Sequence, residues 1–301
     1  MVTPKISLFA TAARPQNWRM FYDSIGENDV AWEVVFVGPN PPDYELPDNF
    51  VYVKTNVKPA QCAEIAIRHA SGDLIMWVCD DMRFTTDHPL DEMYRVYREA
   101  EDELTVVSTI LNDPGIPTWN HFYGGDLTSP EVALCGMMSK RVWLDVGGVD
   151  RRFVALTWDL DVTLGVLARG GKVVYSDVHV DVDYVLPNDP TSKGTILTNE
   201  QRWWDRQFLD GVWTENGKVR KERVGPHEPF DDEDLLTKSQ HPRGHWKYQN
   251  ERLNKLASLV TKYKMRQWRS KTFGRLYRFT VRVSPRPISK VLAKLWANRV
   301  G

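Results

Sequence analysis

Two adjacent carboxylates, Asp80 and Asp81, follow the apolar run at residues 74–78 after a single cysteine. A strand apolar enough to be buried gains little from ending in like charges, because each carboxylate loses hydration and repels the other. Carboxylate oxygens are the hard ligands that Mg²⁺ and Mn²⁺ prefer, and such ions complete their shells with water and substrate phosphates. The pair therefore predicts a site for a metal-bound diphosphate; the alternative is an acidic turn that caps the next helix.

A second acidic group, WDLD, occupies residues 158–161. Asp159 opens a stretch whose apolar residues recur at helical spacing and which ends at Gly170 and Gly171. A carboxylate at this position lies near a helix N-terminus, where the helix dipole stabilises it. Asp is also among the preferred N-cap residues, so that a cap is one explanation of Asp159.

The elements that must position these acids alternate along the chain. Short runs rich in β-branched and aromatic residues predict strands at residues 5–10, 32–37, 50–55, 73–78 and 104–111. Between them, helices are predicted at residues 17–25, 59–70 and 88–104. Strand alternating with helix predicts an α/β fold with a mostly parallel sheet covered by helices on both faces. Ligands of such open sheets bind beyond the carboxyl ends of the strands, where the acid pair falls.

In this order the segments resemble the family 2 glycosyltransferases of the GT-A fold. The resemblance runs from about residue 5 to about residue 184, through ISLFATAARP, EVVFVGP, ASGD, LIMWVCDDM, GGVDRRF and TWDLDVTLGVLARGGKVV. It implies an inverting transferase that uses a nucleotide sugar. In that family the CDDM segment is of the DxD type, which implies a ribose or sugar contact for Asp80 and a ligand of Mn²⁺ or Mg²⁺ for Asp81. The resemblance also implies that Asp159 is the general base.

Some positions differ from the family pattern. Gly38 stands where the family commonly has an acid that reads the base, and Ala63 and Glu64 replace an Arg-Asn pair. Nucleotide-sugar contacts are therefore assigned to Thr11, Arg14 and Lys58, in addition to Asp80. Arg14 and Lys58 could equally be solvated surface charges.

The segment KVVYSDVHVDVDY places His179, Asp181 and Asp183 at alternate positions, on one face of a strand. The family often has a metal-binding histidine at the end of this strand, and Asp183 occupies that place more nearly than His179. Either residue could complete the metal site, and an exposed polar strand face is the alternative for at least one of them.

Aromatic residues near the predicted base are candidates for acceptor binding. The loop at residues 112–131 is rich in Gly and Pro and carries Trp119 and Tyr123. Long loops on a scaffold are often functional, and amphipathic rings suit the apolar faces of sugars, although packing within the loop is an alternative. Trp158, which replaces the usual Glu beside the base, is the third candidate. The segment NEQRWW at 199–204 resembles the QxxRW motif of processive synthases with Asn for Gln, and without a membrane span a single-addition enzyme is expected.

Composition excludes several classes of protein. With 301 residues and 42% hydrophobic content, the chain can bury a sizeable core. The first residues do not read as a signal peptide, and no apolar stretch approaches the length of a membrane span. Three cysteines at unrelated spacings fit a reducing cytosol, so that a cytoplasmic protein is expected.

The formal net charge of −1 conceals a basic C-terminal part. Residues 242–301 carry 16 Lys and Arg and one acid, Glu251. Apolar residues from Ile288 to Trp296 follow the spacing of an amphipathic helix, which suits docking on an anionic cytoplasmic membrane face. Packing on the acidic body and an oligomer contact are alternatives; nucleic-acid binding is disfavoured because no reader motif is present.

Together these features predict a GT-A catalytic domain at residues 1–200 and a basic helical extension at 201–301. The nucleotide-sugar half is expected at about 1–111 and the acceptor half at about 112–200. The expected reaction transfers a sugar from a nucleoside-diphosphate sugar, preferably a UDP-sugar, to a hydroxyl of a glycan or lipid-linked saccharide. A catalytically idle nucleotide- or sugar-binding homologue and a nucleotidyltransferase of similar fold are the alternatives.

Overall fold

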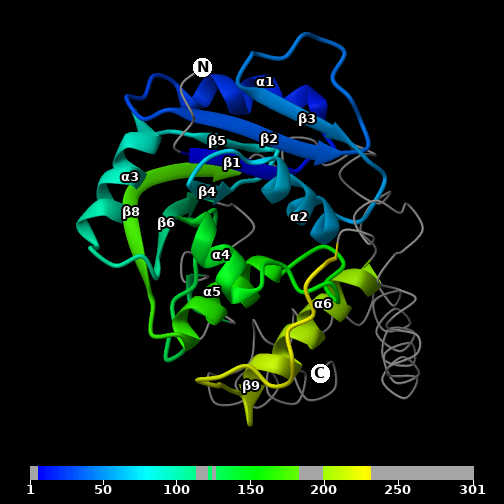
Figure 1. Cartoon of the computed structure of the whole chain (residues 1–301), viewed down its shortest axis with the longest axis vertical. Helices are drawn as coiled ribbons and strands as arrows, with labels where there is room; N and C mark the ends of the chain where they lie inside the picture. Colours follow the sequence, from blue (N-terminus) through cyan, green and yellow to red (C-terminus); the bar gives the residue numbers. More distant parts are fainter. Residues whose placement is uncertain (1–5, 113–120, 124–126, 183–198, 232–301) are drawn as a thin grey trace, which may run out of the picture. The chain divides into compact units, whose positions relative to one another are not determined.

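The computed structural model describes residues 6–112, 121–123, 127–182 and 199–231, and its centre is an eight-stranded sheet (Figure 1). The strands are β1 Ile6–Thr11, β2 Trp32–Gly38, β3 Phe50–Lys54, β4 Leu74–Trp77, β5 Met82–Phe84, β6 Thr105–Asn112, β7 Met137–Ser139 and β8 Lys172–Val182. Their order across the sheet is β3-β2-β1-β4-β7-β6-β8-β5. The pairings β1–β2, β2–β3, β1–β4 and β6–β8 are parallel, and β4–β7, β6–β7 and β5–β8 are antiparallel. The predicted α/β class with a mostly parallel sheet is confirmed.

The helices of the described chain follow the sequence signals closely. They are α1 Pro15–Ile25, α2 Pro59–His69, α3 Pro89–Glu99, α4 Lys140–Val146, α5 Trp158–Ala168 and α6 Asn199–Trp213. Three of them begin at a proline, whose missing N–H is not needed in the first turn. Helix α3 ends at Glu99, short of the predicted Leu104, because Glu101 adopts a left-handed conformation with φ of 51°.

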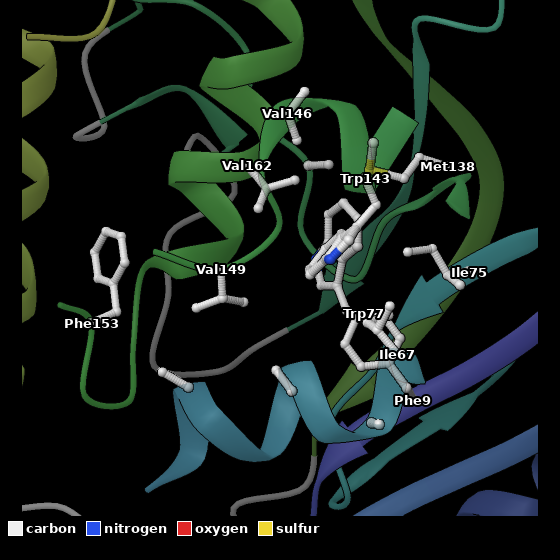
Figure 2. Packing of buried hydrophobic residues seen from close by; sticks show 14 of the residues in the cluster. Phe9, Ile67, Ile75, Trp77, Met138, Trp143, Val146, Val149, Phe153 and Val162 are labelled. Atoms are coloured by element: carbon white, nitrogen blue, oxygen red, sulfur yellow. The ribbon is translucent and has the colours of Figure 1, made fainter. Parts of the chain in front are cut away.

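Helices cover both faces of the sheet. One apolar cluster joins α1 and α3 to side chains such as Leu8 and Phe36. A second cluster joins α2, α4, α5 and α6 to the opposite face. Figure 2 shows Trp143 of α4 at the centre of this second cluster, beside Trp77 and Phe9. The ring centroid of Trp143 lies 6.2 Å from that of Trp77 and 5.5 Å from that of Phe9. Helix α4, which precedes α5, is thus fixed to β1 and to the end of β4.

The body of the protein continues past the boundary predicted at residue 200. Leu209, Val212, Trp213 and Phe230 are buried in the same cluster as α2, α4 and α5. A small hairpin of β9 Thr214–Glu215 and β10 Lys218–Val219 follows α6. The basic segment at 242–301 lies outside the described residues. In the described part of the chain, each helix is too short or too polar to cross a membrane.

The close approach of β1 and β2 at their carboxyl ends depends on Gly38. A Cβ atom added to Gly38 would lie 1.6 Å from the carbonyl oxygen of Ala12, the residue that begins the loop after β1. The atoms nearest to this added Cβ all belong to the backbone of Ala12. Rotation of a neighbouring side chain therefore cannot make room for a methyl group at Gly38.

We expect Gly38→Ala to lower the free energy of unfolding by about 3 kcal/mol, measured by urea denaturation. Gly211→Ala is the matched control. Gly211 lies in α6 with nothing within 4 Å of an added Cβ, so that this change should raise stability by up to about 1 kcal/mol through helix propensity. Equal effects of the two substitutions would contradict the steric explanation.

Candidate active site

Asp80 holds the loop after β1 against the end of β4. Its Oδ2 atom accepts hydrogen bonds from the backbone amides of Ala13 and Arg14 at 2.7 and 2.8 Å. Its Oδ1 atom accepts from Nε of Arg14 at 3.0 Å and from Nη2 of the same guanidinium. Only 2% of Asp80 is exposed. A buried carboxylate in this environment is stabilised by donors on the chain segment that it fixes.

Arg14 also pairs with Asp81, so that one guanidinium bridges both acids. Its Nη1 atom lies 2.5 Å from Oδ2 of Asp81, of which 5% is exposed. Burial raises the pKa of Asp81, and the charge of Arg14 opposes that rise. Burial lowers the pKa of Arg14, but the charges and hydrogen bonds of the two acids raise it more, and the group stays protonated. The cation beside the acid pair is therefore an arginine of the chain itself.

The other predicted donor residues lie at the same edge of the sheet. Thr11 is the last residue of β1, and Lys58 directly precedes the first turn of α2. Asn40, which follows β2, donates from Nδ2 to the carbonyl oxygen of Ala13 at 2.7 Å. Asn40 therefore helps to fix the loop that carries Arg14. Sequence reasoning missed this role, and an Asn two residues after a strand end is too common to reveal it.

Asp159 is the second residue of α5 and is half-buried. The N-cap is Thr157, at φ of 62°, so that Asp159 is not the N-cap residue of α5, although its carboxylate accepts from amides of the first turn. Burial raises the pKa of Asp159 to about 6, although the backbone amides of Leu160 and of Asp159 itself oppose the shift. Within the described residues, no side chain donates a hydrogen bond to this carboxylate. A carboxylate with a pKa near neutrality and no side-chain partner can accept a proton from a bound hydroxyl.

Trp158 and Asp161, which flank Asp159 in the sequence, contact other elements of the fold. Asp161 is buried and accepts from Nε1 of Trp213 at 2.6 Å and from Nε of Arg223 at 3.1 Å. It therefore anchors the last residue of α6 and the segment that follows that helix. The ring of Trp158, predicted to bind an acceptor, stacks on Phe9 of β1 at 6.1 Å between centroids. Through this contact the start of α5 lies against the strand that leads to the Arg14 loop.

The metal prediction can be compared with the ligands that the described chain provides. Asp80 and Asp81 supply hard oxygen donors, and Mg²⁺ needs only one or two protein carboxylates when it also binds phosphates. In this respect the residues fit the ion, which would share Asp81 with Arg14. Among the described residues, no three His, Cys, Asp or Glu side chains gather into a metal-binding group.

The two candidates for a further metal ligand differ in their placement. His179 is exposed on β8, and its carbonyl oxygen accepts from the amide of Thr85, four residues along the chain from Asp81. The structure therefore does not bring His179 to the acid pair. Asp181 binds Arg83 and Asn112. Asp183 lies outside the described residues.

Tyr123 belongs to the packing of α6. It is 4% exposed, its hydroxyl donates to Asp210 at 2.8 Å, and the guanidinium of Arg206 lies 5.0 Å from its ring centroid. These contacts favour the packing alternative that the sequence left open for this residue. Trp119 lies outside the described residues.

Only the comparison with solved structures finds proteins that are similar to this chain. No family model and no curated protein matches the sequence. Among solved structures, the chain is similar to S. aureus TarS 1–349 in complex with UDP-GlcNAc, at 12% identity and a TM-score of 0.49, over 70% of this chain and 67% of that chain. The same protein in complex with UDP gives a TM-score of 0.44 at 12% identity, over 59% and 60% of the two chains. A longer TarS structure gives a TM-score of 0.44 at 13% identity, and the match covers 36% of it and 58% of this chain. At these values the likeness assigns neither an activity nor a ligand to this chain.

Removal of the guanidinium should leave Asp80 and Asp81 as two neighbouring buried charges. We expect Arg14→Ala to lower the free energy of unfolding by about 2 kcal/mol at pH 7. The loss should shrink toward pH 4. Without Arg14 the pKa of Asp81 rises further above its ordinary value, so that the stability of the folded variant is retained at low pH and lost as pH rises through that pKa.

The measurement is chemical denaturation of wild type and variant across this pH range. Arg95→Ala is the control, because Arg95 bridges Glu92 and Glu99 on the exposed side of α3. Exposed pairs contribute little, so that this change should leave stability nearly the same. A loss in Arg14→Ala that does not depend on pH would show that the ion pairs are not its cause.

Proposed function

We propose that the chain is an inverting glycosyltransferase that moves a sugar from a nucleoside-diphosphate sugar to a hydroxyl of a glycan or lipid-linked saccharide. The observation that supports this most is Asp159. It combines a raised pKa of about 6, a place at the start of α5 and no side-chain partner within the described residues. The ordered motifs that resemble family 2 glycosyltransferases supply the reaction class.

In the proposed reaction Asp159 accepts the proton of the acceptor hydroxyl. The acceptor oxygen attacks the anomeric carbon as the bond from this carbon to the diphosphate oxygen breaks, and the configuration inverts. A base with a pKa near the working pH is suited to this transfer, and it typically contributes about 10²–10⁴-fold to the rate.

Donor binding is proposed at the carboxyl ends of β1 and β4. Asp80 would contact the ribose or sugar, and Thr11, Arg14 and Lys58 would contact the nucleotide sugar. Asp81 would hold Mn²⁺ or Mg²⁺, which when bound neutralises charge on the departing diphosphate. A UDP-sugar is the donor proposed first, and residues 242–301 are proposed as a docking segment for an anionic membrane surface.

Asp159→Asn should abolish the function of the base while it preserves the shape of the side chain. We expect the turnover number to fall by about 10²–10⁴-fold with unchanged nucleotide affinity, measured by transfer assays and calorimetry. In wild type, kcat/KM should fall as pH drops below about 6, because Asp159 must be ionised to accept a proton.

Asp145→Asn is the control, because Asp145 is an exposed acid on α4. It should leave the turnover number unchanged. Full activity of Asp159→Asn would refute the proposed role of this residue. Nucleotide binding by a wild type that transfers no sugar would support the catalytically idle homologue instead.

Metal dependence can be tested separately through Asp81. We expect one of UDP, GDP, CDP and dTDP to bind wild type with Mn²⁺ and to bind weakly after chelation, measured by calorimetry. Asp81→Ala should bind this nucleotide equally weakly with and without the metal, because the ligand that connects metal and protein is missing. Tight binding to wild type in the presence of chelator would refute the metal site while leaving the transferase proposal open.

A further inference from the structure

We infer that Asp205 is a positioning residue for Asp159, an inference that rests on the proposed function. Asp205 lies in α6, more than forty residues from Asp159 in the sequence, and none of it is exposed. Its carboxylate binds the backbone amides of residues 154–156, which directly precede α5. The resemblance between NEQRWW at 199–204 and a synthase motif does not include this aspartate.

The carboxylate of Asp205 accepts three consecutive backbone hydrogen bonds. Oδ1 accepts from the amide of Val154, and Oδ2 accepts from the amides of Ala155 and Leu156, each at 2.8 Å. Leu156 is followed by Thr157, the left-handed N-cap of α5, and Asp159 lies two residues further on. The loop directly before the proposed base is thus held by one side chain.

The same loop is tied on its other side to the donor edge of the sheet. The carbonyl oxygen of Val154 accepts from the amide of Ala60, in the first turn of α2, at 3.2 Å. Lys58, a proposed nucleotide contact, lies two residues before Ala60. A shift of the loop would therefore change the place of Asp159 relative to the donor edge.

Helix α6 contacts the base segment on both sides of Asp159 in the sequence. Asp205 holds residues 154–156, and Nε1 of Trp213, two turns later, donates to Asp161 at 2.6 Å. The ring of Phe208 also packs edge-on against Phe153 at 4.9 Å between centroids. Asp159 lies between these attachments without a side-chain donor of its own among the described residues. This arrangement fixes the backbone of the base and leaves its carboxylate available.

Only a carboxylate suits the place of Asp205. It presents acceptors alone, whereas the amide of Asn would direct N–H donors at a backbone N–H. Burial raises the pKa of Asp205 to about 6 despite the three amides, so that the charge is held at a cost in stability. A shift of about 1 Å in a reacting group can reduce a rate by about 10²-fold.

The test compares Asp205→Asn with Glu33→Gln. Glu33 is the matched control, because it is also a buried carboxylate with three donors, namely the hydroxyl of Ser7 and the amide and hydroxyl of Ser71. Asp205→Asn should lower the melting temperature, and Glu33→Gln should lower it less, because all three donors to Glu33 reach one oxygen that an amide oxygen can replace. We expect Asp205→Asn alone to reduce kcat by about 10–10²-fold, with the KM for the donor changed less than twofold.

The pH dependence of kcat/KM is a second measurement, which a purely structural role of Asp205 would leave unchanged. In Asp205→Asn the loosened loop should admit water to Asp159, so that the acidic limb of kcat/KM shifts below pH 6. Asp205→Glu, which keeps the charge on a longer side chain, should fold and show an intermediate kcat.

The outcomes separate this inference from the proposed function. An unchanged kcat in Asp205→Asn, or an equal fall in Glu33→Gln, would overturn the positioning role while the loss of activity in Asp159→Asn still supported the transferase. Full activity of Asp159→Asn would overturn the proposed function itself. If neither Asp205 variant folds, Asp205 is a structural residue and the inference is wrong.

Discussion

The need of buried carboxylates for hydrogen-bond donors determines how the loops of this protein are placed. A carboxylate removed from water must recover its lost hydration from N–H groups nearby. Asp80 recovers it from the loop after β1, and Asp205 from the loop before α5. Glu64 of α2 does the same with the amide of Val149 and the indole of Trp143. Each acid thus fixes a segment that the sheet itself does not hold.

Asp159 differs from these acids because, among the described residues, its carboxylate accepts only from amides at the start of its own helix, those of Leu160 and of Asp159 itself, and holds no distant segment. Its pKa is raised to about 6, above that of an ordinary aspartate. Such a group contributes stability that is present below its ordinary pKa and is lost as pH rises through about 6. At neutral pH the ionised Asp159 therefore opposes folding. Burial raises the pKa of Asp205 to about 6 as well, so that the raised pKa alone does not distinguish Asp159. Among the described residues, the choice of Asp159 rests on a carboxylate that holds no distant segment and lies at the start of α5.

The strands and helices could be predicted from the sequence better than the side-chain contacts between them. The strands before Asp80 and the helix that begins at Trp158 followed from periodicity and turn residues. The partner of the acid pair did not follow, because Arg14 reaches it from 66 positions away and looked equally like a surface charge. Asp205 was missed for the same reason, since residue type and spacing do not reveal a tertiary partner. Strands as short as β5 and β7 carry too few residues to show a period.

Under the proposed function, the charge balance of the acid pair would favour a divalent ion in addition to the arginine. Asp80 and Asp81 together with Arg14 carry a net charge of −1 when all are ionised, and the diphosphate of a nucleotide sugar carries about −2. These charges repel at short range in a poorly solvated site. A bound divalent ion would reverse the sign of the proposed site, and Arg14 could then donate to the phosphate oxygens. Arg14 supports two buried carboxylates, and in the proposed donor complex the same guanidinium would become available to the donor once the ion takes over part of that role.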